Sequence, residues 1–471
     1  MMADSAPSSG EYNMAKAVKY DLTEGSIRRN IIRLSIPMII ANAGQSVYNL
    51  VDIYFVSKLG KVAVAATSMS GMIMMMIFTI NLGLSIATQA MVARFYGSKN
   101  YFQVQQAIFS SFLWGLIGSV LIAVFGIFGS RHLLRLIGAS PEVIEMGLGY
   151  IRIMFIGMVF NVFFFIGNAS FHGAGNSRTP MIAGLAGVFV NIVLDPALIF
   201  GIGPFPELGI DGAAFATIIG RFVAMFGVVY MLLRDKNIFR YSFKEMHPDT
   251  TLIKETFRIG LPGAAQLGIR SLSYIVFMRL VAQFGTAAVA ALGVCFRLNM
   301  FILLPTFAVS AAVGSMVGQN LGAGKIERAK KSATGAAFSV AVFLWTVAFV
   351  AVFFGRSILG HFLSGVPLHY AYMFLLCLAM GYTFSAFGIT FNGSARGAGD
   401  TIMPLFIIII AYFFGAVPAA YFISRTFLGV GGVFIGYFLG MVLYSVMMII
   451  YFESGRWIRQ KIAYDKPDKK T

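Results

Sequence analysis

The sequence is poor in the charged side chains that a soluble protein places on its surface. Only 12% of its 471 residues are charged, whereas 58% are hydrophobic. Soluble domains carry about 25% charged residues. So few charges cannot cover a water-facing surface of this size, which excludes an ordinary soluble protein. The composition is that of a chain whose solvent is lipid.

Cysteine and histidine are also scarce. The two cysteines, Cys295 and Cys377, lie in apolar runs, which excludes a disulfide framework. The five histidines show no metal-ligand spacing. The segment 318–325 resembles a phosphate loop, but it has Gln319 where the first glycine belongs and Ile326 after the lysine. We therefore expect no enzyme activity, no cofactor and no ATP-driven mechanism.

Long hydrophobic runs dominate what is present. A helix needs about 20 apolar residues to cross the hydrocarbon core of a bilayer. Short polar segments divide the chain into twelve apolar runs of that length, which predict an all-α membrane protein with twelve transmembrane helices. The predicted spans are 34–57, 64–92, 107–129, 146–171, 180–201, 210–233, 260–283, 288–317, 332–355, 368–393, 403–424 and 429–452.

The basic residues set the orientation of these spans. The chain carries 36 Lys and Arg but only 19 Asp and Glu. The termini and the even-numbered connections hold 25 of the basic residues, and the odd-numbered connections hold 6. By the positive-inside rule, both termini are expected in the cytoplasm, in a multi-pass protein of the cell (inner) membrane. This placement explains the basic excess without a nucleic-acid partner.

The chain also repeats itself. At a shift of 225 residues several glycines, alanines and prolines coincide without gaps, for example Pro37 with Pro262 and Gly97 with Gly322. Each half contains six spans, so both halves enter the membrane with the same orientation. This predicts two six-helix bundles related by a pseudo-twofold axis along the membrane normal. The expected segments are a cytoplasmic N-terminal tail 1–30, bundles 31–233 and 258–453, a cytoplasmic linker 234–257 and a cytoplasmic C-terminal tail 454–471.

Two carboxylates are the strongest functional candidates. Asp52 and Asp195 are the only acidic residues clearly inside the predicted spans, and both lie within roughly 10 Å of the outer boundary. Ionisable groups within a membrane are costly and are usually functional. The alternative is that they only bond neighbouring helices. The equivalent positions of the second half hold Phe277 and Ala419, so one half alone carries the acidic pair.

Polar neighbours accompany these carboxylates. Spacings of three and four residues place Asn42, Gln45, Asn49 and Asp52 on one helical face, with Tyr48 beside it. Other candidates share faces or depth with the pair: Asn191 four residues before Asp195, Tyr150 and Asn161 eleven residues apart in one span, and Thr217. Two carboxylates, an amide and a hydroxyl suit a small hard cation, and a shared proton fits equally well.

The second half carries arginines instead. Arg270 and Arg297 lie deep in predicted spans without an acidic residue to pair with. They either contact the substrate, lock the halves together or bond backbone carbonyls. The same alternatives apply to Arg221 in the first half, where the structural role is favoured. A methionine cluster that includes Met72 is a candidate for an adaptable binding surface, although lipid contact is the favoured interpretation for most of it.

With these residues in view, residues 30–455 resemble the multidrug and toxic compound extrusion (MATE) family. The resemblance rests on Pro37, the segment 48–52 (YNLVD), the GAG turn 173–175, Asn191 with Asp195, and the segment 318–324. It implies a V of two bundles around a central cavity. It also implies a cation site of Asp52, Asn191, Asp195 and Thr217, surrounded by Tyr48, Tyr150 and Asn168. Pro37 breaks the hydrogen-bond ladder of its helix, which can bend there.

We therefore expect a monomeric antiporter that exports amphipathic, cationic organic compounds by alternating access, in exchange for Na⁺ or H⁺. The cavity candidates are Gln45, Asn49, Met72, Arg270 and Arg297. A related flippase for lipid-linked saccharides remains an alternative, because arginines in the cavity suit an anionic head group. A membrane-embedded transferase is a more distant one, since no substantial extramembrane loop is visible to hold a catalytic cluster.

Overall fold

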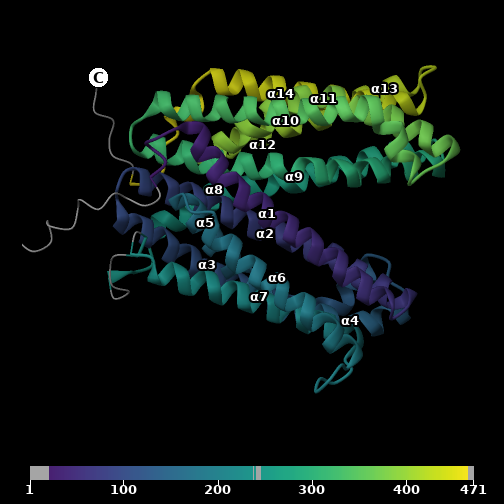
Figure 1. The fold of residues 1–471 in the computed structure, drawn as a ribbon, viewed down its shortest axis with the longest axis horizontal. Helices are drawn as coiled ribbons and strands as arrows, with labels where there is room; N and C mark the ends of the chain where they lie inside the picture. Colours follow the sequence, from purple (N-terminus) through teal and green to yellow (C-terminus); the bar gives the residue numbers. More distant parts are fainter. Residues whose placement is uncertain (1–20, 237, 240–244, 465–471) are drawn as a thin grey trace, which may run out of the picture.

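The computed structural model describes residues 21–236, 238–239 and 245–464, and this part of the chain is helical throughout. Its helices form two bundles that meet at one end and diverge toward the other (Figure 1). The first bundle contains α1 (Ile27–Ser57), α2 (Lys61–Gly97), α3 (Tyr101–Leu136), α4 (Pro141–Ile156), α5 (Met158–Ala174), α6 (Arg178–Phe200) and α7 (Gly209–Arg234).

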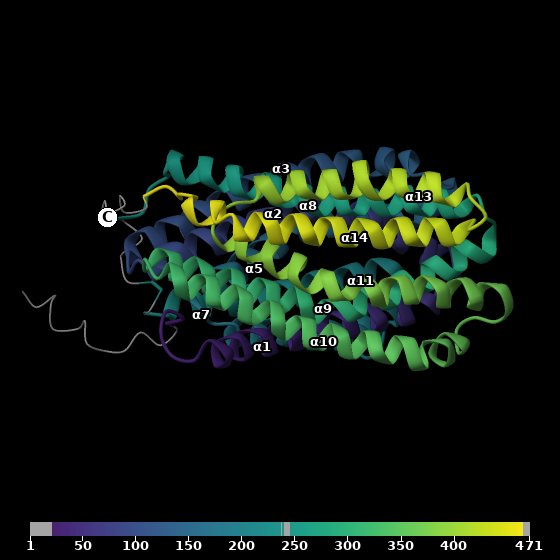
Figure 2. The ribbon, with the colours of Figure 1, turned by 90° about the horizontal axis from the view of Figure 1, so that it is seen from above.

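The second bundle follows the same plan. It contains α8 (Thr250–Ala282), α9 (Thr286–Gly322), α10 (Ile326–Gly360), α11 (Gly365–Gly397), α12 (Ile402–Ile409), the π-helix η3 (Ile410–Ala416), α13 (Val417–Ser424) and α14 (Val430–Glu453), with the short 3₁₀ helix η4 (Arg456–Arg459) after it. Seen from above, α14, α10 and α11 lie over the helices of the first bundle (Figure 2).

The twelve predicted spans all appear as helices. Two of them are each divided: α4 and α5 form one span bent by 42°, and α12, η3 and α13 run from Ile402 to Ser424. In the described residues, nine helices are long and apolar enough to cross a membrane, or ten with the bent pair. The two remaining long helices, α1 and α8, do not meet this criterion. These are repeat mates of 31 and 33 residues that carry more polar side chains.

The helices extend beyond the predicted spans, mostly at the end where the bundles meet. Helix α1 begins at Ile27, inside the predicted tail 1–30, and α8 begins at Thr250, inside the predicted linker 234–257. Part of each segment is outside the described residues. A span predicted from hydropathy ends where the charged residues begin. The α-helix itself continues past the lipid boundary as long as its backbone groups remain paired.

Backbone-to-backbone packing closes the end where the bundles meet. A β-carbon at Gly97 would collide with the carbonyl oxygen of Gln319, and one at Gly322 would collide with that of Arg94. Gly83 and Gly260 likewise bring α2 and α8 together. Small residues allow this approach between membrane helices. The contact pairs α2 with α9 through residues that the 225-residue repeat makes equivalent.

Side-chain hydrogen bonds tie the bundles across the same end. Gln89 of α2 donates to the Ala311 carbonyl at 2.9 Å and to the Ser315 hydroxyl at 2.8 Å. Gln319 of α9 donates to the Gly173 carbonyl of α5 at 2.8 Å and accepts from the backbone N–H of Leu22 at 3.0 Å. One buried glutamine thus joins the N-terminal segment to both bundles.

Candidate functional site

The polar face predicted for α1 borders a central cavity of about 800 Å³. Asn42, Gln45 and Asn49 line it, and Gln45 donates to the Asn49 amide oxygen at 3.3 Å. Asp52 is one turn further along the helix and is not part of the lining. The three amides of the predicted face thus line the cavity, whereas the carboxylate does not.

Two glycines place the other half of the candidate ion site. A β-carbon at Gly187 of α6 would meet the Gly220 carbonyl of α7, and one at Gly220 would meet the Gly187 carbonyl and the β-carbon of Asn191. This close crossing brings the Asn191–Asp195 face of α6 beside Thr217 of α7. Both α6 residues are buried, and Asp195 is 0% exposed.

The oxygen atoms of this cluster lack donors. Asn191 donates to one oxygen of Asp195 at 3.2 Å. The second Asp195 oxygen, one oxygen of Asp52 and the amide oxygen of Asn191 are buried with no hydrogen-bond partner in the described part of the chain. Asp52 and Asp195 are close enough to interact electrostatically. Buried polar atoms without partners are uncommon, and several acceptors around one point suit a cation.

A second, much smaller cavity of about 20 Å³ adjoins the large one and shares part of its lining. Its polar lining residues are Asn191, Gln45, Tyr48, Thr217 and Arg221, and all of them except Asn191 also line the large cavity. A space of this size holds about one water-sized species. The Tyr48 and Thr217 hydroxyl groups are 3.1 Å apart, so this hydrogen-bonded pair borders both spaces.

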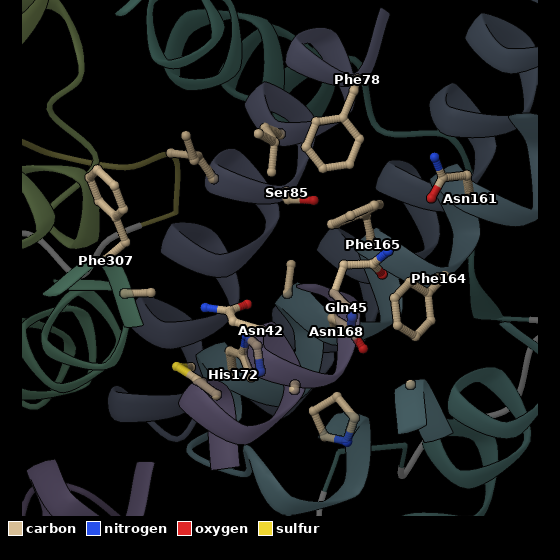
Figure 3. Close-up of a pocket in the computed structure, with 18 of the residues that line it drawn as sticks. Asn42, Gln45, Phe78, Ser85, Asn161, Phe164, Phe165, Asn168, His172 and Phe307 are labelled. Atoms are coloured by element: carbon tan, nitrogen blue, oxygen red, sulfur yellow. The ribbon is translucent and has the colours of Figure 1, made fainter. Parts of the chain in front are cut away.

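The large cavity is mainly aromatic and apolar between the bundles. Figure 3 shows Phe164 and Phe165 of the first bundle on one side and Phe307 of the second bundle on the other. The Phe78 and Phe165 rings meet edge to face at 5.0 Å. Drug-sized ligands bind in clefts of roughly 300–1,000 Å³ with mostly apolar walls and a few polar groups. The cavity has this size and character.

Basic residues that the sequence did not favour line the same cavity. Among the described residues in its wall, the side chains that can carry a positive charge are Arg221 of α7, Arg396 of α11 and His172 of α5, and no Asp or Glu lines it. Arg396 donates twice to the Gln266 side-chain oxygen, at 2.8 and 3.2 Å. Arg221 carries the same sequence signal as Arg270 and Arg297, a charge inside a span.

Three cavity candidates lie elsewhere. Arg270 is half-buried within the second bundle, with its guanidinium 5.9 Å from the Phe307 ring and 5.7 Å from the Tyr444 ring. Arg297 is exposed on α9 and Met72 is exposed on α2. None of them lines the cavity, so a contact between these residues and a substrate stays a prediction.

The predicted pairing of Tyr150 and Asn161 on one helical face does not survive the break between α4 and α5. The spacing of eleven residues assumes a straight helix, but the span bends by 42° at Gly157. Tyr150 is buried within electrostatic reach of Asp52, whereas Asn161 lines the large cavity. Asn168 also lines that cavity, as do Tyr48 and Thr217, so its place in the surrounding network stays a prediction.

Comparison with known families identifies the chain. The MatE family model matches it twice, over residues 37–197 and 262–422. The two matches are 225 residues apart, the same shift that the internal repeat shows, and together they cover more than half of the sequence. The chain belongs to the MatE family. It is therefore a multi-pass membrane transporter and not an enzyme.

Individual MatE-family relatives match along nearly the whole chain. The probable multidrug resistance protein YoeA of Bacillus subtilis is 28% identical, covering 93% of this chain and 96% of the relative. The probable multidrug resistance protein NorM of Thermotoga maritima is 24% identical, with 93% and 94% covered. A crystal structure described as MATE in the bent conformation superposes with a TM-score of 0.86 at 26% identity, covering 92% of this chain and 96% of that one.

Proposed function

We propose that this MatE-family transporter exports amphipathic organic compounds, as multidrug efflux by alternating access, in exchange for Na⁺ or H⁺ bound in the first bundle. Small-molecule substrates and a membrane location follow from the family, whose members need no cofactor. The observation that carries the proposal is a large cavity of the size of an organic substrate in the same protein as a buried cluster of unpartnered oxygens on Asp52, Asn191 and Asp195.

The cation site comprises Asp52, Asn191, Asp195 and Thr217, with Tyr48 and Tyr150 around it. Its unpartnered oxygens are satisfied when a small cation, or a proton shared by the carboxylates, is present. Because Tyr48 and Thr217 border both spaces, ion binding alters the wall against which the substrate packs. The ion and the substrate can therefore influence each other without direct contact.

Alternation between two states requires the closed end to open. The first and last described residues, 21 and 464, and the even-numbered connections lie at that end, and the excess of basic residues there supports a cytoplasmic location by the positive-inside rule. The described conformation then faces outward, away from the cytoplasm. The bend expected at Pro37 is one route by which α1 moves the Asp52 region relative to the cavity.

Transport by the purified protein in lipid vesicles tests this proposal. The vesicles are loaded with a fluorescent amphiphile for export. A Na⁺ gradient or an H⁺ gradient is then imposed, in separate experiments. We expect one gradient to drive export in wild type, and Asp52→Asn and Asp195→Asn each to abolish this dependence. Asp211→Asn is the matched control, because this carboxylate of α7 is not in the cluster. Gradient-driven export by both cluster variants would contradict the proposal.

The flippase alternative makes a different prediction. A flippase for lipid-linked saccharides moves a substrate anchored in the bilayer, and soluble amphiphiles should then neither bind nor be exported. The multidrug names of the relatives and the aromatic walls of the cavity favour the soluble amphiphile.

A further inference from the structure

The charges that line the large cavity are of one sign. Sequence reasoning expects cationic substrates, but the charged side chains among the described residues of the wall are two arginines, with no carboxylate. An arginine side chain stays protonated at any physiological pH. The substrate therefore faces a positive surface within a space of low dielectric constant, where the repulsion of an organic cation is stronger than in water.

The carboxylates of the first bundle do not offset this charge in the cavity. Asp52 and Asp195 are absent from its lining. No ion pair between Arg221 or Arg396 and an acidic side chain occurs within the described part of the chain. Charges inside a membrane protein are normally paired or face water or a ligand, so these two need a partner.

Two hydrogen bonds fix the Arg396 guanidinium in an orientation that suits anion binding. Its Nε and one Nη both donate to Gln266, and Gln266 is itself fixed by a 2.7 Å hydrogen bond to the Thr401 carbonyl. Helices α8 and α11 and the start of α12 thus hold the guanidinium in one orientation. Its remaining donors have no recorded protein acceptor among the described residues. A preorganised guanidinium presents a planar fork of donors that matches carboxylate and phosphate groups.

Arg221 forms the second contact from the opposite bundle. Its guanidinium lies 5.8 Å from the centre of the Tyr48 ring and makes no hydrogen bond within the described residues. Arg221 lines both cavities, near the middle of α7. An acidic group in the large cavity therefore meets an unpaired arginine in the wall of either bundle.

Resting on the proposed function, we propose that the exported compounds are amphipathic organic acids and zwitterions, whose acidic group binds Arg221 or Arg396 while an aromatic body packs against the phenylalanines of the cavity. Phe164, Phe165 and Phe307 supply that apolar surface (Figure 3). A zwitterion suits both the arginines and the aromatic surface, because its acidic group can bind an arginine while its cationic part stacks on the aromatic rings.

Three xanthene dyes test this assignment with a nearly constant body. Rhodamine 123 is cationic, rhodamine 110 is the corresponding free acid and is zwitterionic, and fluorescein is anionic. Equilibrium binding to the full-length protein in lipid nanodiscs needs no ion gradient. We expect the zwitterion and the anion to bind at least about ten-fold more tightly than the cation, the gain from one charge-assisted hydrogen bond.

Variants then identify the contacts. Arg221→Gln and Arg396→Gln should each weaken binding of rhodamine 110 and fluorescein by about ten-fold, without weakening that of rhodamine 123. Arg221→Lys and Arg396→Lys keep the charge and should retain most of the preference. Arg279→Gln, which removes an exposed charge from the last turn of α8, is the matched control. Thermal unfolding of each variant verifies that it is folded.

Two outcomes overturn the assignment: binding without preference for the acidic dyes, including no binding at all, or an unchanged preference in both glutamine variants. Neither depends on coupling to an ion. Preferential export of rhodamine 123 down an imposed gradient would refute the substrate class and leave the antiport mechanism intact. A preference for acidic dyes without any gradient-driven export would support the substrate class and refute the antiport mechanism.

Discussion

The hydroxyl groups of Tyr48 and Thr217 lie 3.1 Å apart, and both residues line the large cavity and the small one. Helix α1 supplies the tyrosine and α7 the threonine. This hydrogen bond therefore lies on the border that the two cavities share.

Removing this hydrogen bond should weaken the coupling between ion and substrate. We expect Tyr48→Phe and Thr217→Val, which nearly preserve shape, to raise the ion concentration for half-maximal export by about three- to ten-fold, corresponding to one hydrogen bond of about 1 kcal/mol. Export rates measured against Na⁺ and H⁺ concentration provide the test. Thr67→Val is a control, because this hydroxyl bonds only backbone carbonyls of its own helix α2. An unchanged ion dependence in both cavity variants would remove the hydroxyl pair from the coupling path.

The backbone contact at the closed end should be intolerant of side chains. Gly97→Val places atoms where the Gln319 carbonyl lies, so the α2–α9 contact must separate. We expect a cysteine at position 315, buried in the wild type, to become reactive toward a water-soluble thiol reagent. The labelling background carries Cys295→Ser and Cys377→Ser.

Gly118→Ala is the control for this substitution, because nothing lies within 4 Å of the added carbon. Slow labelling at position 315 in both the Gly97 variant and this control would mean that the bundles remain closed without the contact.

Gln319 should contribute disproportionately to stability. Its replacement by Leu leaves the Gly173 carbonyl and the Leu22 N–H without their partners in a buried place. Two such groups cost about 2–4 kcal/mol together. Thermal unfolding in detergent should show a clear loss for Gln319→Leu and little change for Gln283→Leu, which alters an exposed glutamine. Equal stability of the two variants would contradict the role of Gln319.

The orientation follows from the charge distribution and can be tested directly. We expect a cysteine at Lys236, beside the closed end, to be labelled by a membrane-impermeant reagent only after cells are permeabilised. A cysteine at Glu207, in the connection at the open end, should be labelled in intact cells. Both positions are exposed. The reverse pattern would mean that the described conformation opens toward the cytoplasm.

Much of this architecture was predictable because lipid imposes simple rules. Twelve apolar runs, the 225-residue repeat and the polar face of α1 depend on composition and spacing alone. Asp52 and Asp195 can be identified from the sequence alone, since a carboxylate inside a span is rare. The division into two bundles follows from counting six spans in each half.

The remaining features depend on tertiary packing. The break at Gly157 places Tyr150 and Asn161 in different surroundings, although a straight helix would align them. Arg221 lines the cavity whereas Arg297 does not, yet both are arginines inside spans, and only the rotation of each helix against its neighbours distinguishes them. Likewise, Met74 and Met75 line the cavity while Met72 points away from it.

The closed-end contact has the character of a homodimer interface. Gly97 meets Gln319 and Gly322 meets Arg94, and each residue of one pair is the repeat mate of a residue in the other. Two identical subunits related by a twofold axis would make this same isologous contact. In such a dimer, any substitution would appear on both sides. Within one polypeptide the two sides change independently. This chain is therefore symmetric at the contact between the bundles, although the second bundle has Phe277 at the position where the first has Asp52.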